Sequence, residues 1–378
     1  MIYFDNAAAT KTLKESAQCA LKMMTEEFGN PSSLHSFGFA AEKSIDKAEK
    51  DILKCFKNAF GDFYFTSGGT EANNIAILGF CRRMKRYGRH IITSFIEHPS
   101  VINSFEMLKD EGFKITYAET DSNGIVNIEK LAELVKDDTI FVSIMNVNNE
   151  IGSIQNINEI GRIIKKKNEN VVFHSDCVQS FTKQEIDLKY VDIATVSGHK
   201  IHAPKGVGGI YIKKGIKISP IGAGGSQQRG IRPGTENTPA ICAFACSSNI
   251  MIEKMKENEQ KAKIVKNELI KIQNMIDGVN INGSIENGSP YILNLSFEGV
   301  KAEVLLHALE KENIYVSTGA ACSSRQKKHK TTVSIIAPKM ADSSLRFSFC
   351  AENTLKEAQI CRDVIIDCVK KLRKYKKR

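Results

Sequence analysis

The chain has 378 residues, of which 42% are hydrophobic, and it carries a formal net charge of +10 at pH 7. This composition excludes a disordered protein and, with only 26 glycines, a collagen-like one. The length is typical of a globular protein with two domains, or with one large domain and an appendage. No apolar run approaches the roughly 18 residues of a membrane-spanning helix, and the N-terminal sequence predicts neither a signal nor a transit peptide.

Short runs rich in β-branched and aromatic residues alternate with helical patterns over the first two thirds of the chain. Most of these runs show little polar alternation, which is typical of strands buried on both faces. Strands that alternate with helices, such as those expected from residue 72 and over 101–109, indicate a mainly parallel sheet covered on both sides. The predicted strands are 63–65, 90–95, 113–118, 139–145, 171–174, 192–196 and 208–212.

From Thr238 onward the pattern predicts a second, smaller α+β domain. A long helical stretch extends to about residue 275 and would act as the hinge between the two domains. The elements expected after it are a strand over 292–297, a helix over 302–311, a strand over 345–349 and a closing helix from Thr354.

Three segments directly follow predicted strands, which is where open α/β sheets bind their ligands. Residues 66–71, with the sequence TSGGTE, could form an anion site at a helix N-terminus or simply a helix cap. Residues 176–179 begin with Asp176, which is either a ligand partner or another cap. Residues 197–200 end with Lys200, which could form a Schiff base or lie in a solvated turn. On spacing alone, each pair of alternatives stays open.

The cysteines and the basic residues are further features with alternative interpretations. The ten cysteines include no CxxC pair, so we expect reduced thiols of a cytoplasmic protein and no metal site. Basic residues gather at 327–330 and 370–378, which we interpret as a solvated loop and a solvated helix end. The alternative is attraction of an acidic partner or RNA. Neither cluster belongs to a nucleic-acid-binding motif, so we do not expect direct nucleic-acid binding.

Several longer motifs occur in a fixed order over residues 3–350: YFDNAAAT, GNPSSLHSFG, FTSGGTEANN, EHPSV, VNNEIG, FHSDCVQS, SGHK, RGIRPGTEN and STGAAC. Together they resemble the cysteine desulfurases of the NifS/IscS type. These are fold-type I enzymes of the class-V aminotransferase family, and they depend on pyridoxal 5′-phosphate (PLP). The resemblance implies a large PLP-binding domain over 15–255. It also implies a small α+β domain, formed by 1–14 and 256–378, with the catalytic cysteine loop and the arginine that binds the substrate carboxylate.

The resemblance assigns roles in the PLP site to residues of these motifs. Lys200 matches the lysine that forms the Schiff base and afterwards carries protons. Asp176 matches the carboxylate that faces the pyridine nitrogen and keeps it protonated. His98 matches the histidine stacked on the ring, which can also act as an acid or base. The remaining cofactor contacts would come from Gly69, Thr70, Asn149, Gln179, Ser197, His199 and, across a dimer interface, Thr235.

Three further matches concern the substrate. Arg346 resembles the arginine that binds the substrate carboxylate, since a guanidinium fits a carboxylate bidentately; the alternative is a surface arginine on a strand. Asn30 resembles a residue that helps to position the substrate. Cys322 of STGAAC matches the thiol that takes up sulfur as a persulfide. Its small neighbours suit a mobile loop, and the basic residues of 325–328 would favour the thiolate.

We therefore expect a homodimeric, cytoplasmic cysteine desulfurase that converts L-cysteine to L-alanine and a persulfide on Cys322. The persulfide would supply sulfur to an acceptor protein, such as an iron–sulfur scaffold or an enzyme that thiolates tRNA or a cofactor. One alternative is a selenocysteine lyase, or another class-V enzyme, in which Cys322 is dispensable. The alternative from a different class is a non-catalytic relative that binds RNA or protein.

Overall fold

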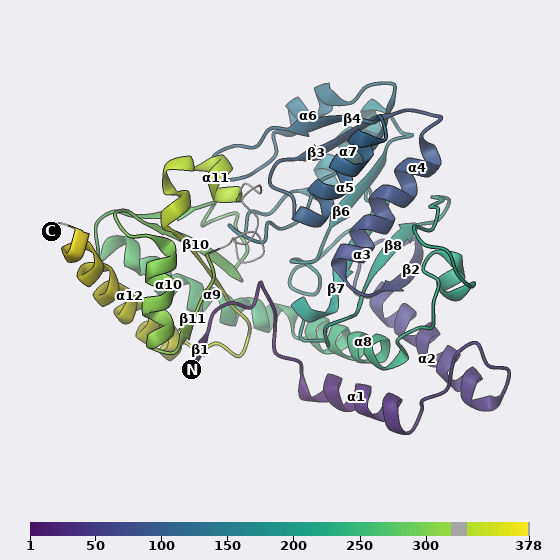
Figure 1. Ribbon diagram of the computed structural model, residues 1–378, viewed down its shortest axis with the longest axis horizontal. Helices are drawn as coiled ribbons and strands as arrows, with labels where there is room; N and C mark the ends of the chain where they lie inside the picture. Colours follow the sequence, from purple (N-terminus) through teal and green to yellow (C-terminus); the bar gives the residue numbers. More distant parts are fainter. Residues whose placement is uncertain (319–330, 377–378) are drawn as a thin grey trace.

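A seven-stranded sheet forms the centre of the larger part of the molecule (Figure 1). The computed structural model describes residues 1–318 and 331–376. Strand β8 is antiparallel to both of its neighbours, and every other neighbouring pair in this sheet is parallel. The predicted α/β fold with a mainly parallel sheet is thus confirmed. In spatial order the strands are β2 (Gly61–Thr66), β8 (Gly208–Lys213), β7 (Ile193–Ser197), β6 (Val172–Asp176), β5 (Thr139–Ser143), β3 (His90–Ser94) and β4 (Lys114–Ala118).

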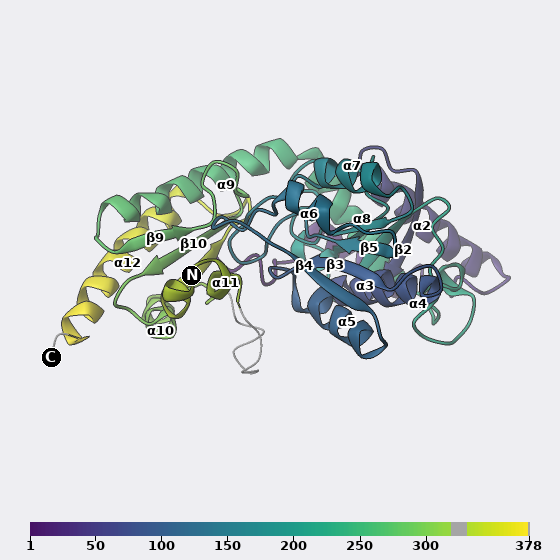
Figure 2. The same ribbon diagram turned by 90° about the horizontal axis from the view of Figure 1, so that it is seen from above.

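Helices cover both faces of this sheet, as the view in Figure 2 shows. Two separate apolar clusters fill the two interfaces, which explains why the strand sequences are apolar on both sides. One face carries α2 (Ser36–Leu53), α6 (Ile128–Leu134), α7 (Ile157–Lys167) and α8 (Thr238–Glu253), with α1 (Lys14–Thr25) packed on α8. The other face carries α5 (Pro99–Asp110) and the continuous helical run of α3 (Gly69–Asn74), a π-helical turn (Ile75–Gly79) and α4 (Phe80–Met84).

A three-stranded antiparallel sheet organises the smaller part of the molecule, and it has its own apolar core. Its strands lie in the order β12 (Ser344–Ser348), β10 (Ile292–Phe297) and β9 (Val279–Asn282). The helices around this sheet are α9 (Met255–Ile270), α10 (Ala302–Lys311), α11 (Thr332–Ile336) and α12 (Leu355–Lys376).

The long helix predicted from Thr238 to about residue 275 is in fact broken. Helix α8 ends at Glu253, α9 begins at Met255, and a 3-10 turn follows over Lys271–Asn274. The cause is tertiary. Helix α8 contributes Phe244 to the core below the large sheet, whereas α9 buries its side chains in the core of the small sheet. One straight helix would not present its apolar side chains to both cores.

The N-terminal arm connects the two parts of the molecule. Strand β1 (Ile2–Tyr3) pairs in parallel with β11 (Ile314–Tyr315), on the side of the small sheet. A few residues later, the Thr10 N–H donates to the His199 carbonyl at 3.0 Å, on the side of the large sheet. Residues 5–10 therefore pass between the two sheets, next to the ends of β6 and β7.

Two classes of feature are absent from the described ranges, 1–318 and 331–376. None of the helices there is long and apolar enough to cross a membrane. No group of three or more histidine, cysteine or acidic side chains in these ranges is placed to hold a metal ion.

Candidate active site

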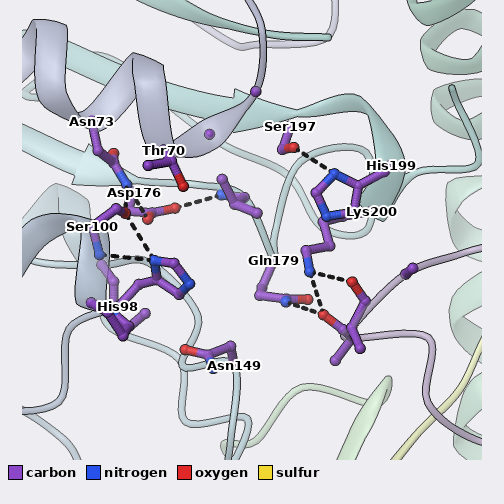
Figure 3. Close-up of a pocket in the computed structure, with 18 of the residues that line it drawn as sticks. Thr70, Asn73, His98, Ser100, Asn149, Asp176, Gln179, Ser197, His199 and Lys200 are labelled. Atoms are coloured by element: carbon purple, nitrogen blue, oxygen red, sulfur yellow. Dashed lines mark hydrogen bonds between the residues drawn. The ribbon is translucent and has the colours of Figure 1, made fainter. Parts of the chain in front are cut away.

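A cavity of about 570 Å³ opens at the carboxyl ends of the parallel strands, where it is bordered by the N-terminal arm and by β12. This position is the usual ligand site of open α/β sheets, because loops from several strands converge there. Figure 3 shows side chains from separate elements converging around it. Of the residues predicted from the sequence, the cavity is lined by Gly69, Thr70, His98, Asn149, Asp176, Gln179, Ser197, His199, Lys200 and Arg346.

Lys200 lies at the end of a short 3-10 turn that directly follows β7. Its Nζ donates to two backbone carbonyls of the N-terminal arm, those of Ala7 and Ala8, at 2.7 Å each. These bonds hold the amine at the cavity and in a defined direction. A primary amine in this position can form a covalent bond with an aldehyde ligand.

Asp176 is the last residue of β6 and is only 4% exposed. Asn73 donates its side-chain amide to Asp176 Oδ2 at 2.8 Å, and the Val178 N–H donates to Oδ1 at 2.9 Å. Asn73 in turn accepts from the Thr195 hydroxyl at 2.6 Å, so its amide orientation is fixed. The two hydrogen bonds fix the direction of this buried carboxylate.

His98 forms the N-cap of α5, immediately before Pro99. Its Nδ1 accepts from the Ser100 backbone N–H at 3.2 Å and lies 2.8 Å from the Ser100 hydroxyl. A nitrogen that accepts from a backbone N–H carries no proton, so the proton of the neutral ring is on Nε2. Burial lowers the pKa of His98, while the nearby Asp176 raises it and Lys200 lowers it further. The ring is therefore neutral near pH 7.

Small and polar residues near the start of α3 and the end of β7 form another part of the cavity lining. Thr70 and Gly69 begin α3, and a Cβ on Gly69 would lie 2.9 Å from Val178 Cγ2, so a larger residue here would require Val178 to move. Ser197 Oγ lies 3.0 Å from His199 Nδ1. Burial and the neighbouring lysines lower the pKa of His199 to about 4, so its ring is uncharged. This part offers hydroxyl, ring and backbone N–H groups in the arrangement that suits a phosphate.

Arg346 enters the cavity from β12 and is 4% exposed, so it is not a surface arginine. Its Nη2 donates to Asp5 Oδ1 at 2.8 Å, and its Nη1 donates to the Asn149 carbonyl at 2.9 Å. The Nε atom is buried and has no hydrogen-bond partner among the described residues. A carboxylate ligand would supply the acceptor that Nε lacks.

Two predicted site residues do not line the cavity, and a third lies outside the described residues. Asn30 is exposed, and its side chain accepts from the Ser32 N–H at 2.9 Å. Thr235 is also exposed and borders a separate, smaller cavity. Cys322 lies outside the described residues. The roles of these three residues stay predictions.

The structure adds residues to which the sequence motifs assigned no role. Asn73 and Ser100 hold Asp176 and His98, as described above. The Glu150 carboxylate accepts from the Thr332 N–H at 2.8 Å, at the start of α11. Burial raises the pKa of Glu150 to about 7. All three residues lie inside recognised motifs, but nothing in the sequence indicates which partner each one contacts.

Comparison with known proteins places this site in a family. The sequence matches the family described as Aminotransferase class-V over residues 2–360. It is 38% identical to a cysteine desulfurase IscS of Clostridium botulinum, over 98% of this chain and 95% of the relative. It is 39% identical to a NifS/IcsS protein homolog of Lactobacillus delbrueckii subsp. bulgaricus, over 95% and 94% of the two chains. The chain belongs to the class-V aminotransferase family, among the cysteine desulfurases.

Solved structures agree with this assignment. A NifS-like protein superposes with a TM-score of 0.91 at 34% identity and covers 98% of this chain and 99% of its own. SspA, solved in complex with cysteine, superposes with a TM-score of 0.80 at 28% identity, covering 92% and 99%. Cysteine desulfurases of the class-V family depend on PLP, so the expected fold type and cofactor are confirmed at the level of the family.

The cavity fits PLP on its own geometry. An amine on Lys200 and a buried carboxylate on Asp176 face the same space, and a neutral imidazole lies beside them. Gly69 at the start of α3 also lines this space. The polar end around Thr70 and Ser197 suits the phosphate of the cofactor.

Proposed function

We propose that this protein is a PLP-dependent L-cysteine desulfurase whose acceptor thiol is Cys322. In the overall reaction the Cβ–S bond of L-cysteine breaks, its sulfur forms an S–S bond with Cys322, and L-alanine leaves. The observation that carries the proposal is the convergence of Lys200, Asp176, His98 and Arg346 on one cavity in a chain of this family.

The residues of the cavity would hold the cofactor at both ends. Asp176, fixed by Asn73, would face the ring nitrogen and keep it protonated. Gly69, Thr70, Ser197 and His199 would hold the phosphate, while Gln179 and Asn149 would contact the phenolic-oxygen side. When bound, PLP supplies an electron sink for the electron pair released at the α-carbon of the substrate.

The substrate would be held and deprotonated by groups that the fold already orients. Arg346 would bind the substrate carboxylate through its unpaired Nε and an adjacent Nη. The Lys200 amine would accept and return the proton at the α-carbon, and neutral His98 would exchange a proton at Nε2. Nucleophilic attack on sulfur would be the task of Cys322, whose thiolate the basic residues 325–328 would favour.

A homodimer is part of the same proposal. Exposed apolar side chains gather on α1, on α2 and on the segment that joins them, where a monomer would leave them in water. Thr235, which is exposed and outside its own cavity, would reach the phosphate of the partner subunit. The apolar residues are Leu21, Met24, Phe28, Leu34, Phe37 and Phe39, which we call the α1–α2 patch.

The domain boundaries, the sulfur acceptor and the role of Asn30 are also part of the proposed function. We place the large domain at 15–255 and the small domain at 1–14 and 256–378. The persulfide would pass to an acceptor protein in the cytoplasm, such as an iron–sulfur scaffold or a thiolating enzyme. Asn30 would help to position the substrate.

The proposal is tested by incubating the PLP-loaded protein with L-cysteine and measuring alanine and persulfide. We expect Cys322→Ser to lose both products, because no other thiol would reach the substrate. Cys368→Ser, on α12 and outside the cavity, is the control and should retain both. Alanine release at an undiminished rate by Cys322→Ser would favour a selenocysteine lyase or another class-V enzyme instead.

The cofactor bond is tested separately by absorption spectroscopy. We expect the wild type to show a visible band with added PLP and Lys200→Ala to lose that band. A wild-type protein that stays colourless in the presence of PLP would contradict the proposed function and favour a non-catalytic relative.

A further inference from the structure

Lys183 is a buried lysine that the proposed mechanism does not use. It follows β6, next to the active site, and is 7% exposed. Apart from burial, the groups that shift its pKa are Lys200, which lowers it, and Cys350, which raises it to a smaller extent; no carboxylate is among these causes. Burial lowers the pKa of Lys183 to about 7. Burial of an ammonium group without a carboxylate partner opposes folding, so its presence here calls for a function.

The contacts of Lys183 lead directly to the catalytic lysine. Its Nζ lies 3.5 Å from Gln179 Oε1 and 5.7 Å from the centroid of the Tyr291 ring, so the ammonium is between an amide oxygen and an aromatic face. Gln179 Nε2 donates to the Ala7 carbonyl at 3.0 Å, and Lys200 Nζ donates to the same carbonyl at 2.7 Å. Figure 3 shows Gln179 and Lys200 converging on the N-terminal arm.

The chemistry of the two side chains fixes how Gln179 is oriented. An amide has an acceptor end and a donor end, and the lysine amine can donate an N–H whether or not it is charged. Lys183 Nζ donates to Oε1 of Gln179 and the Ala7 carbonyl accepts from Nε2, so the NH2 group is directed toward Ala7 and the cavity. A ligand oxygen in the cavity would then meet a donor rather than a second acceptor.

The backbone immediately before Lys183 is strained, which is a separate observation. Thr182 has a φ of 56°, a left-handed conformation that is rare for a β-branched residue, and its buried hydroxyl has no partner among the described residues. Such strain persists only where the surrounding structure enforces it, and it is concentrated at functional sites. Here it occurs at the residue that precedes the buried lysine.

We propose that Lys183 is a positioning residue that directs the donor end of Gln179 into the cofactor cavity. This inference rests on the proposed function, because it assumes that PLP presents an oxygen to Gln179. It also explains why a lysine is buried beside Lys200 although the two cations repel each other.

The other titratable groups near Lys183 do not take over its role. His199 and His202 sense its charge, and burial lowers the pKa of both rings, so they are neutral. Burial raises the pKa of Cys350, which therefore remains a thiol. Lys183 is thus the titratable group that donates to the Gln179 amide oxygen.

The test is the pH midpoint of the visible absorption band of the PLP-loaded protein, which reports the proton on the Lys200 nitrogen. We expect Lys183→Met to raise this midpoint by about one pH unit, because a donor to the cofactor oxygen and a nearby positive charge are both lost. PLP should also dissociate more readily from this variant. In a Gln179→Leu background, Lys183→Met should cause less than half of that shift, since the group through which it acts is absent.

Two further variants keep the test decisive. Lys183→Gln retains an NH2 group that can donate, so we expect less than half of the shift seen with methionine. Lys266→Met is the matched control, because Lys266 is also buried but donates to the Ser289 carbonyl at 2.8 Å in the small-sheet part. We expect it to lower stability and leave the midpoint unchanged.

The outcomes separate this inference from the proposed function. An unchanged midpoint in Lys183→Met, or an equal shift in Lys266→Met, would overturn the positioning role while the visible band of the wild type still supports the enzyme. A full shift caused by Lys183→Met in the Gln179→Leu background would also overturn the positioning role. Absence of the wild-type band would instead contradict the proposed function itself.

Discussion

At the scale of single residues, burial decides which groups are charged. Desolvation lowers the pKa of His98 and His199 and raises that of Glu97 and Glu150, so all four favour their neutral forms more than they would in water. The same effect raises the thiol pKa of each of the nine described cysteines, none of which forms a disulfide. Their environment is that of inert structural thiols.

Glu97 offers a pH-dependent test of this effect. Burial raises its pKa from 4.5 to about 8, while one carboxylate oxygen accepts from Ser94 and from the Met145 N–H. The folded protein therefore retains a proton that the unfolded chain releases. This contribution to stability is fully present below pH 4.5 and is lost as the pH rises toward 8.

We expect Glu97→Gln, which cannot ionise, to remove this loss. The difference in the free energy of unfolding between variant and wild type should move in favour of the variant by up to about 1.4 kcal/mol per pH unit between pH 5 and 8. Urea denaturation at several pH values measures it. Glu303→Gln, at an exposed position on α10, should show no such trend. A constant difference for Glu97→Gln would mean that Glu97 is charged in the folded state.

At the scale of elements, close packing of helices on the large sheet limits the size of the side chains at the contact. This limit can outweigh helix propensity. Gly161 is in the interior of α7, where a glycine normally weakens a helix. A Cβ at this position would lie 2.6 Å from the Tyr190 carbonyl oxygen and 3.1 Å from a Phe173 ring carbon. The glycine therefore lets α7 approach the sheet closely.

We expect Gly161→Ala to destabilise the protein even though alanine favours helices by about 1 kcal/mol. Overpacking costs roughly 1–3 kcal/mol, so the free energy of unfolding should fall. Chemical denaturation measures the change, and Lys166→Ala at an exposed position on the same helix should be close to neutral. A more stable Gly161→Ala variant would show that α7 can move away from the sheet at little cost.

At the scale of the whole molecule, the exposed α1–α2 patch predicts that the protein is a dimer. Leu34 is fully exposed and Phe28 is 68% exposed, and the Phe28 and Phe37 rings lie 5.7 Å apart in one cluster. A second copy would cover these side chains and bring its Thr235 to the cofactor site.

We expect Leu34→Glu to shift the protein from dimer to monomer in analytical ultracentrifugation, because a carboxylate at the interface would be desolvated. PLP retention should fall with the dimer, since the contact from Thr235 is lost. Val304→Glu, at an exposed apolar position on α10, is the control and should leave the dimer intact. A wild-type protein that sediments as a monomer with PLP bound would contradict the shared site.

The sequence alone predicted the α/β class, the central strands and the family, because each depends on local patterns or on contiguous motifs. The residues lining the cavity could be assigned only through the family resemblance. Tertiary structure was needed for the break between α8 and α9, since two separate cores impose it. It was also needed for the contacts of the site: Arg346 with Asp5, Asp176 with Asn73, and Lys200 with Ala7 are 341, 103 and 193 residues apart in the chain. The physical reason is that such partners meet only when the two cores pack around the N-terminal arm, and no local pattern specifies which distant groups come within hydrogen-bonding distance.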